Sequence, residues 1–157
     1  MDKPIIFSID DDPQVLNAIA RDLKARYSND YKVISTTSAT EALEMVVELK
    51  NESRAIAMFI CDQRMPKMTG VEFMVSAIKI YPDTKRILLT AYADTETAII
   101  AINKAQLDYY LTKPWDPAEK ELYPVVDDLL SDWECTYTLI LKEYVLLDFN
   151  ILPIPTV

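Results

Sequence analysis

Acidic, hydroxyl and basic side chains stand directly after four of the short apolar runs of this 157-residue sequence. The first run ends at Asp10, Asp11 and Asp12, the third at Asp62, the fourth at Thr90 and the fifth near Lys113. In an open parallel sheet the functional crevice lies beyond the carboxyl ends of the strands. These side chains therefore converge on one pocket if the first, third, fourth and fifth strands are neighbours.

Asp10, Asp11 and Asp62 would crowd negative charge in such a pocket. Two unit charges about 4 Å apart repel by about 4 kcal/mol at an effective dielectric constant of 20, so a cation must lie among them. Mg²⁺ fits this role because it is a hard octahedral ion that one or two carboxylates hold while waters remain for exchange with a phosphate. Lys113 supplies a second, fixed positive charge.

Asp62 is the candidate nucleophile because it stands alone at the end of a central strand. A carboxylate can attack phosphorus and form an acyl phosphate if a metal ion and a lysine neutralise the charge on the transferring group. A hydroxyl at Thr90 could then hydrogen-bond the new phosphoryl oxygens, a contact that exists only in the modified protein. We therefore expect a switch rather than a catalyst.

Each of these features also has an ordinary structural explanation. The acidic run before Pro13 is typical of a helix N-terminus whose acids complement the helix dipole. Asp62 could be a solvated loop acid, Thr90 a helix cap and Lys113 a surface lysine. Their placement at successive strand ends, in this order, favours the functional interpretation.

The elements that would position these side chains alternate along the chain. Short apolar runs alternate with longer segments of helical periodicity, which indicates βα units stacked on a parallel sheet. We expect strands at residues 4–9, 31–35, 56–61, 86–89 and 107–111, and helices at 13–27, 38–50, 71–81, 95–104 and 117–133. The fold class is therefore α/β, with five units in one domain.

Local signals mark where these helices begin. Asp12 is the expected N-cap of the first helix, with Pro13 in its first turn. Ser38 and Glu41 form an expected capping box for the second helix. Gly70, the only glycine of the protein, lies in the loop before the third helix. With so few glycines, we expect this one to occupy a backbone geometry that other residues resist.

Composition argues against several kinds of chemistry and partner. Sixteen basic against twenty-five acidic residues give a net charge of −9, which argues against direct contact with nucleic acid. The sequence contains no histidine, which excludes Ser-His and Cys-His dyads and imidazole metal sites. Cys61, expected in the core, and Cys135 are the only cysteines, and no signal segment opens the sequence. We expect a cytoplasmic protein.

The sequence becomes strongly apolar after about residue 134. This last segment is too apolar for a solvated linker, and exposed patches of such size usually mark a contact surface. Lys142, Glu143 and Asp148 interrupt it, so no run approaches the roughly 20 apolar residues that a membrane span needs. We expect one domain over residues 1–134 and a tail over 135–157 that packs on the domain or pairs with a partner, a homodimer being one hypothesis.

Four motifs resemble the receiver domain of bacterial response regulators, over approximately residues 4 to 133. They are Ile5-Ile6-Phe7-Ser8-Ile9-Asp10-Asp11-Asp12-Pro13, Cys61-Asp62-Gln63-Arg64-Met65-Pro66-Lys67-Met68-Thr69-Gly70, Leu88-Leu89-Thr90-Ala91 and Tyr110-Leu111-Thr112-Lys113-Pro114-Trp115. The resemblance implies a flavodoxin-like doubly wound (βα)5 parallel sheet with strand order 2-1-3-4-5. It also implies phosphorelay signalling between a sensor histidine kinase or phosphotransfer protein and a downstream protein target.

The same resemblance assigns roles to the acidic pocket. Asp62 is the implied phosphoacceptor and Asp11 a direct Mg²⁺ ligand. Asp10 is the partner acid, which often acts through water, and the backbone carbonyl of Arg64 is a further ligand. Lys113 is the implied fixed cation. Beyond this self-phosphorylation and dephosphorylation at an aspartate, we expect no enzymatic turnover.

Thr90 and Tyr110 resemble the switch pair of the family. In that pair the hydroxyl moves to the phosphoryl group and the aromatic ring turns inward behind it. The resemblance also implies a cis bond at Lys113-Pro114, and it places Arg64 and Tyr92 where side chains can gate the access of water to the acyl phosphate. The surface made by the fourth helix, fifth strand and fifth helix should change most.

Three other interpretations remain open at this point. The segment from Lys113 to Trp133 looks like receivers fused to thioredoxin-reductase-like flavoproteins, although one glycine cannot supply the motif Gly-x-Gly-x-x-Gly, so this chain would be a truncated or stand-alone relative. A flavodoxin-like cofactor binder would need Ser, Thr and Gly after the first strand, where three acids stand. A carboxylate-based phosphatase typically has a second Asp two residues after its nucleophile, where Arg64 stands.

Overall fold

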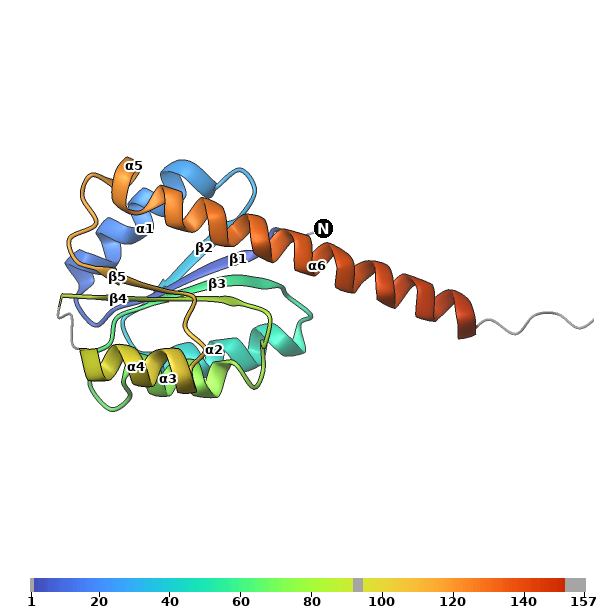
Figure 1. Cartoon of the computed structure of the whole chain (residues 1–157), viewed down its shortest axis with the longest axis horizontal. Helices are drawn as coiled ribbons and strands as arrows, with labels where there is room; N and C mark the ends of the chain where they lie inside the picture. The colour runs from blue at the N-terminus through green and yellow to red at the C-terminus, as the bar shows by residue number, and fades with distance from the viewer. Residues whose placement is uncertain (1, 92–94, 152–157) are drawn as a thin grey trace, which may run out of the picture.

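Five parallel strands form one sheet in the order β2-β1-β3-β4-β5 (Figure 1). The computed structural model describes residues 2–91 and 95–151, and side chains as far as residue 147. The strands are β1 (Ile5–Ile9), β2 (Lys32–Thr36), β3 (Ile56–Cys61), β4 (Lys85–Thr90) and β5 (Tyr109–Thr112). The predicted fold class and strand order are confirmed.

Helices cover both faces of the sheet (Figure 1). One face carries α1 (Pro13–Tyr27), the short α5 (Ala118–Glu121) and α6 (Tyr123–Ile151). The other carries α2 (Ala39–Asn51), α3 (Gly70–Ala77) and α4 (Thr95–Lys104). Each face therefore has its own apolar core. Within residues 2–91 and 95–151, no helix combines the length and the apolar character needed to cross a bilayer.

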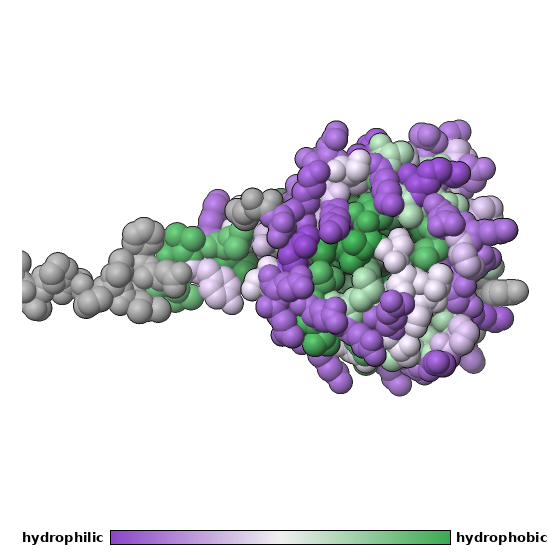
Figure 2. All heavy atoms as spheres, turned by 180° about the vertical axis from the view of Figure 1, so that it is seen from behind, coloured by the Kyte–Doolittle hydropathy of each residue, from purple (hydrophilic) through white to green (hydrophobic). Residues whose placement is uncertain are grey.

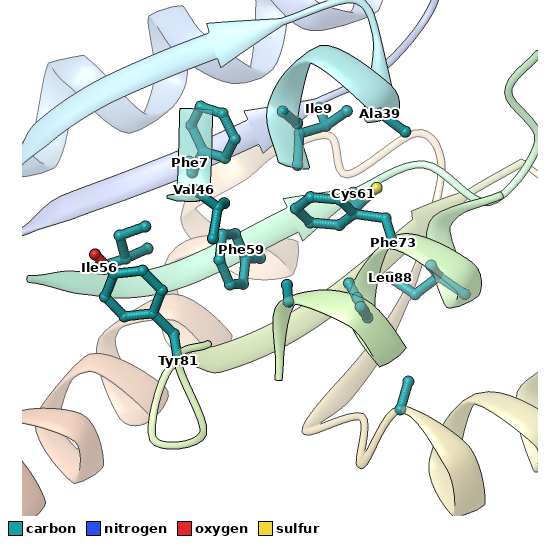
Figure 3. Packing of buried hydrophobic residues seen from close by; sticks show 14 of the residues in the cluster. Phe7, Ile9, Ala39, Val46, Ile56, Phe59, Cys61, Phe73, Tyr81 and Leu88 are labelled. Atoms are coloured by element: carbon teal, nitrogen blue, oxygen red, sulfur yellow. The ribbon is translucent and has the colours of Figure 1, made fainter. Parts of the chain in front are cut away.

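The central strand β3 is buried along its whole length, which explains its uninterrupted apolar sequence. Successive side chains of a strand point to opposite faces, so Phe59 and Cys61 lie in one core while Met58 and Ile60 lie in the other. Figure 3 shows the first of these cores, in which the rings of Phe7 and Phe73 approach Phe59 edge to face at 6.2 and 5.3 Å. The core position predicted for Cys61 is confirmed.

The helix starts follow the local signals with one exception. Asp12 caps α1 through a bond from the amide of Gln14. Ser38 caps α2 by accepting from the amide of Glu41, but the Glu41 carboxylate accepts a bond at 2.8 Å from the Thr36 hydroxyl at the end of β2. The predicted capping box at α2 is therefore only half formed, because Glu41 is engaged by its neighbouring strand.

The last predicted helix differs most from the structure. A helix was expected over residues 117–133, whereas α5 ends at Glu121 and α6 then runs without a break from Tyr123 to Ile151. Pro124 lies in the first turn of α6, a position at which proline is tolerated. The sequence then has no glycine or proline until Pro153, so no residue of the helix-breaking types stops it near 134.

Candidate functional site

Neighbouring strands β1 and β3 place Asp10 and Asp62 side by side. Ile9 pairs with Cys61 across the two strands, and the amide of Asp62 donates to the carbonyl of Ile9 at 2.9 Å. Asp10 and Asp62 are 3% and 7% exposed, whereas Asp11 is exposed. One carboxylate oxygen of each of these three acids lies within 4.8 Å of the other two. The structure thus brings together the three acids singled out in the sequence.

Lys113 bridges the two buried acids. Its Nζ donates to Asp10 Oδ2 at 2.6 Å and to Asp62 Oδ1 at 3.2 Å. Strand β5 positions it, because the amide of Lys113 donates to the carbonyl of Thr90 at the end of β4. The bond Lys113-Pro114 is cis, as the family resemblance implies. Four strand ends therefore meet at one point, as the order of the strands requires.

The charges of this cluster perturb one another. Burial raises the pKa of the Asp62 carboxyl, and the charge of Asp10 raises it further, against the opposing effect of Lys113. Burial alone would lower the pKa of Lys113, but its hydrogen bonds to Asp10 and the two negative charges outweigh burial and raise it. The lysine therefore remains a cation, and it balances one of three carboxylates.

The donor set fits a small divalent cation. Mg²⁺ prefers carboxylate, carbonyl and water oxygens, and Asp10, Asp11 and Asp62 supply three carboxylates within reach of one point. Because Lys113 neutralises one of the three carboxylates, negative charge remains for such an ion to neutralise. Arg64, whose backbone carbonyl is the fourth expected ligand, lies two residues after Asp62 in the loop that follows β3.

Gly70 holds the loop after β3 in place, for a reason that differs from the one expected. Its φ is not positive, so the expectation of an unusual backbone geometry was wrong. A Cβ at this position would instead lie 2.2 Å from the carbonyl oxygen of Asp62 and 2.9 Å from the side chain of Leu88. The absence of a side chain lets the N-terminus of α3 approach the residue that carries the candidate nucleophile.

Two further features secure this loop and were not identified in the sequence. The Gln63 side chain accepts from the amide of Val71 at 3.0 Å. Thr69 and Glu72 form a reciprocal capping box at the start of α3. The spacing of Thr69 and Glu72 is a readable signal for such a box. Gln63 had no local signal, because its partner is defined only by the path of the loop.

Thr90 and Tyr110 project from the same face of the sheet. Leu88 pairs with Tyr110 and Thr90 with Thr112, and alternate residues of a strand share a face. Thr90 is 2% exposed, and Tyr110 is half-buried against the core that contains Phe59. Both residues make interactions within the protein. Tyr92, the other expected gate beside Arg64, lies outside the described residues.

The family described as the response regulator receiver domain matches residues 6–123. The chain belongs to this family. It is 31% identical over 112 residues to the hydrogenase transcriptional regulatory protein HoxA of Cupriavidus necator, covering 71% of this chain and 21% of that protein. It is 30% identical over 123 residues to the transcriptional regulatory protein GlrR of Escherichia coli, a match that covers 78% of this chain and 25% of that protein. The receiver domain thus spans about a fifth to a quarter of the length of these curated relatives.

Solved receiver structures agree with the fold. The signal receiver domain of an HD domain-containing protein from Pseudomonas fluorescens matches at a TM-score of 0.73 and 28% identity, over 85% of this chain and 98% of that chain. A CheY-like receiver domain protein from Methanospirillum hungatei matches at a TM-score of 0.73 and 27% identity, over 86% of this chain and 99% of that chain. The chain is therefore a response regulator receiver domain of phosphorelay signalling, and the flavoprotein alternatives find no support in these comparisons.

Proposed function

We propose that this receiver domain accepts a phosphoryl group on Asp62 from a sensor histidine kinase or a phosphotransfer protein, and that the resulting aspartyl phosphate changes how it binds a downstream protein. The observation that supports this most is the position of Lys113 Nζ between Asp10 and Asp62. A fixed cation at the nucleophile can neutralise charge on a transferring phosphoryl group.

The chemistry divides between the side chains of the pocket. An oxygen of Asp62 attacks phosphorus, a new oxygen–phosphorus bond forms, and the bond from phosphorus to the donor breaks, its electron pair leaving with the donor. Asp10, Asp11 and Asp62, with the carbonyl of Arg64, would hold Mg²⁺, which supplies charge neutralisation when bound. Lys113 supplies the positive charge that the chain itself contributes.

Thr90 and Tyr110 form the proposed switch. The hydroxyl of Thr90 lies at the end of β4, next to the strand that carries Lys113, so a phosphoryl group on Asp62 offers it a new hydrogen-bond acceptor. Movement of Thr90 makes room for Tyr110 on the same face of the sheet. Phosphorylation shifts the population towards the conformer in which these contacts form.

The role is regulatory and the partners are proteins. We assign no turnover of an external substrate to this domain beyond its own phosphorylation and dephosphorylation. The net charge of −9 opposes binding of this chain to a phosphate backbone, although curated relatives are named transcriptional regulatory proteins. We propose a cytoplasmic location, where histidine kinases deliver their phosphoryl groups.

Intact-mass spectrometry tests the proposal. Incubation with Mg²⁺ and acetyl phosphate should add the mass of one phosphoryl group to the wild-type protein, and acetate should leave. The Asp62→Asn variant should gain none, and a chelator should prevent the addition. Asp128→Asn, a matched change at an exposed position of α6, should behave as wild type. Phosphorylation of Asp62→Asn at the wild-type level would show that another residue is the acceptor.

A further inference from the structure

Helix α6 continues beyond the body of the domain (Figure 1). Its exposed apolar side chains there include Tyr144, Leu146 and Leu147, which are 64%, 64% and 57% exposed. Figure 2 shows apolar side chains on this projecting part of the molecule. Monomeric proteins rarely expose contiguous apolar surface of this kind without a partner.

One stripe of this helix is continuous with the core of the domain. We call it the α6 seam, and it consists of Val126, Leu130, Trp133, Tyr137, Ile140, Tyr144 and Leu147. These positions are spaced alternately by four and three residues, which is the spacing of a helix that packs along a second helix. The first three are buried, the next two are half-buried and the last two are exposed. The spacing of the seam therefore continues beyond the body of the domain, but there its side chains are no longer buried by the rest of the chain.

A groove adjoins the point where the seam leaves the body. Its cavity of about 440 Å³ lies between α6 and the amino-terminal edge of the sheet, opposite the acidic pocket. Tyr81 and Pro82 form part of its wall on the body, beside the charged residues Lys50, Arg54 and Asp83. Its wall on the helix consists of Trp133, Tyr137, Ile140 and Tyr144, so four of the seven positions of the α6 seam face this groove.

We propose that the α6 seam and this groove form a symmetric, antiparallel contact with a second copy of the chain. In a two-fold contact the same patch serves both copies. If the two helices cross near residue 142, midway between Tyr137 and Leu147, each copy's Leu147 lies opposite the other copy's Tyr137. Leu147 of each copy then lies in the groove of the other copy, so the α6 seam of one copy buries the groove of the other.

Charge supports the antiparallel arrangement. Each copy carries a net charge of −9, and a parallel pair would hold the two acidic bodies at the same end of the helices. An antiparallel pair separates them by the length of the projecting segment. Lys142 and Glu143 are the two charged residues between Leu139 and Leu147, and their opposite signs leave this segment neutral, so two copies meet there without net repulsion.

Sedimentation or light scattering of the whole chain over a concentration series tests the dimer. Leu147→Glu should raise the dimer dissociation constant by about tenfold or more, as expected when a charge is buried against the apolar side chain of Tyr137 and the groove of the other copy. Leu146→Glu is the matched control, because Leu146 is similarly exposed but lies on the opposite side of the helix. A monomer at all concentrations, or equal effects of the two variants, would overturn the proposal.

The variant Ile102→Glu tests whether two copies associate through α4 and not through the α6 seam. Ile102 is 55% exposed, close to the value for Leu147, but it lies far from the α6 seam on the other face of the sheet. The proposal requires that this variant dimerise as the wild type does. Loss of the dimer in Ile102→Glu with retention in Leu147→Glu would assign the contact to α4 instead.

The orientation of the helices can be measured through Cys135, which is exposed, whereas Cys61 is buried. A nitroxide on Cys135 reports the distance between the two copies by electron paramagnetic resonance. In the antiparallel pair the two labelled positions are offset by fourteen residues, or about 21 Å along the helix axis. In a parallel pair they are level, with the helix axes about 8–10 Å apart. The shorter distance would contradict the antiparallel contact.

Discussion

The helices α4 and α6 lie on opposite faces of the sheet and are held in different ways. Among the residues of α4, Ala101 is the buried one, while Ile99, Ile100 and Ile102 are 46–55% exposed. The first turns of α6 bury Val126, Leu130 and Trp133. The apolar contact that fixes α6 is therefore much larger than the one that fixes α4.

Polar contacts add to this difference. Asp127 of α6 accepts from Arg26 at 2.6 and 3.0 Å and from the Tyr27 hydroxyl at 2.7 Å, which ties α6 to α1. Further along, the hydroxyl of Tyr31 donates to the Glu134 carboxylate. Trp115, before α5, donates to Asp22 of α1 at 2.8 Å. Helix α6 is thus anchored to α1 through Asp127 and to the turn after α1 through Glu134.

The difference indicates which surface can respond to the acidic pocket. A switch needs an element whose displacement costs little free energy, and α4 has few buried contacts to lose. It also follows β4, at whose end Thr90 lies. The helices α1 and α6 instead form a more firmly packed frame. Within the predicted surface of the fourth helix, fifth strand and fifth helix, we therefore expect a signal from Asp62 to move α4 most.

Removal of the largest side chain of this frame should have the largest effect. Trp133→Ala empties a buried site and ends its stacking with Tyr137 at 4.6 Å, so the free energy of unfolding should fall by about 3–5 kcal/mol. The matched change on the other helix, Ile102→Ala, should alter it by less than about 0.5 kcal/mol. Urea denaturation measures both. A comparable loss in the two variants would remove the distinction between α4 and α6.

Loss of one polar contact should have a smaller effect. Tyr27→Phe removes the hydroxyl that donates to Asp127 while keeping the ring, so the free energy of unfolding should fall by about 1 kcal/mol. Tyr109→Phe is the control, because Tyr109 is 43% exposed on β5, beside the loosely held side of the domain. Equal denaturation midpoints for wild type and Tyr27→Phe would show that this contact does not stabilise the frame.

The pH dependence of stability should show the smallest effect. The hydrogen bond from Arg26 lowers the pKa of Asp127, against the opposing effect of burial. A lowered folded-state pKa stabilises the protein above the unfolded value of about 3.9 and ceases to do so as the pH falls through the folded value. Asp127→Asn should therefore be less stable than wild type at neutral pH, and the difference in their free energies of unfolding should decrease below about pH 4. Acid titrations followed by circular dichroism measure this difference. A difference that stays constant with pH would contradict this role for the Asp127 carboxylate.

Local patterns in the sequence were sufficient for most of the fold. The continuous apolar run Ile56–Cys61 marked the buried central strand, and Asp12 with Pro13 marked the start of α1. The acidic pocket was also predictable, because Asp10, Asp62 and Lys113 follow predicted strands and the family resemblance supplied the order of those strands. Such features depend on a residue's nearest neighbours in the chain and on the rules of parallel sheets.

What the sequence by itself determined is therefore the order of the elements and the residue types that meet at the carboxyl edge of the sheet. Only the tertiary structure decided why position 70 must be glycine, because the conflict is with the carbonyl of Asp62 on another segment. It also decided that the Glu41 carboxylate accepts a hydrogen bond from Thr36 and so does not complete its capping box. These outcomes depend on close approach in space, and the distance between two atoms brought together by folding cannot be inferred from their separation along the chain.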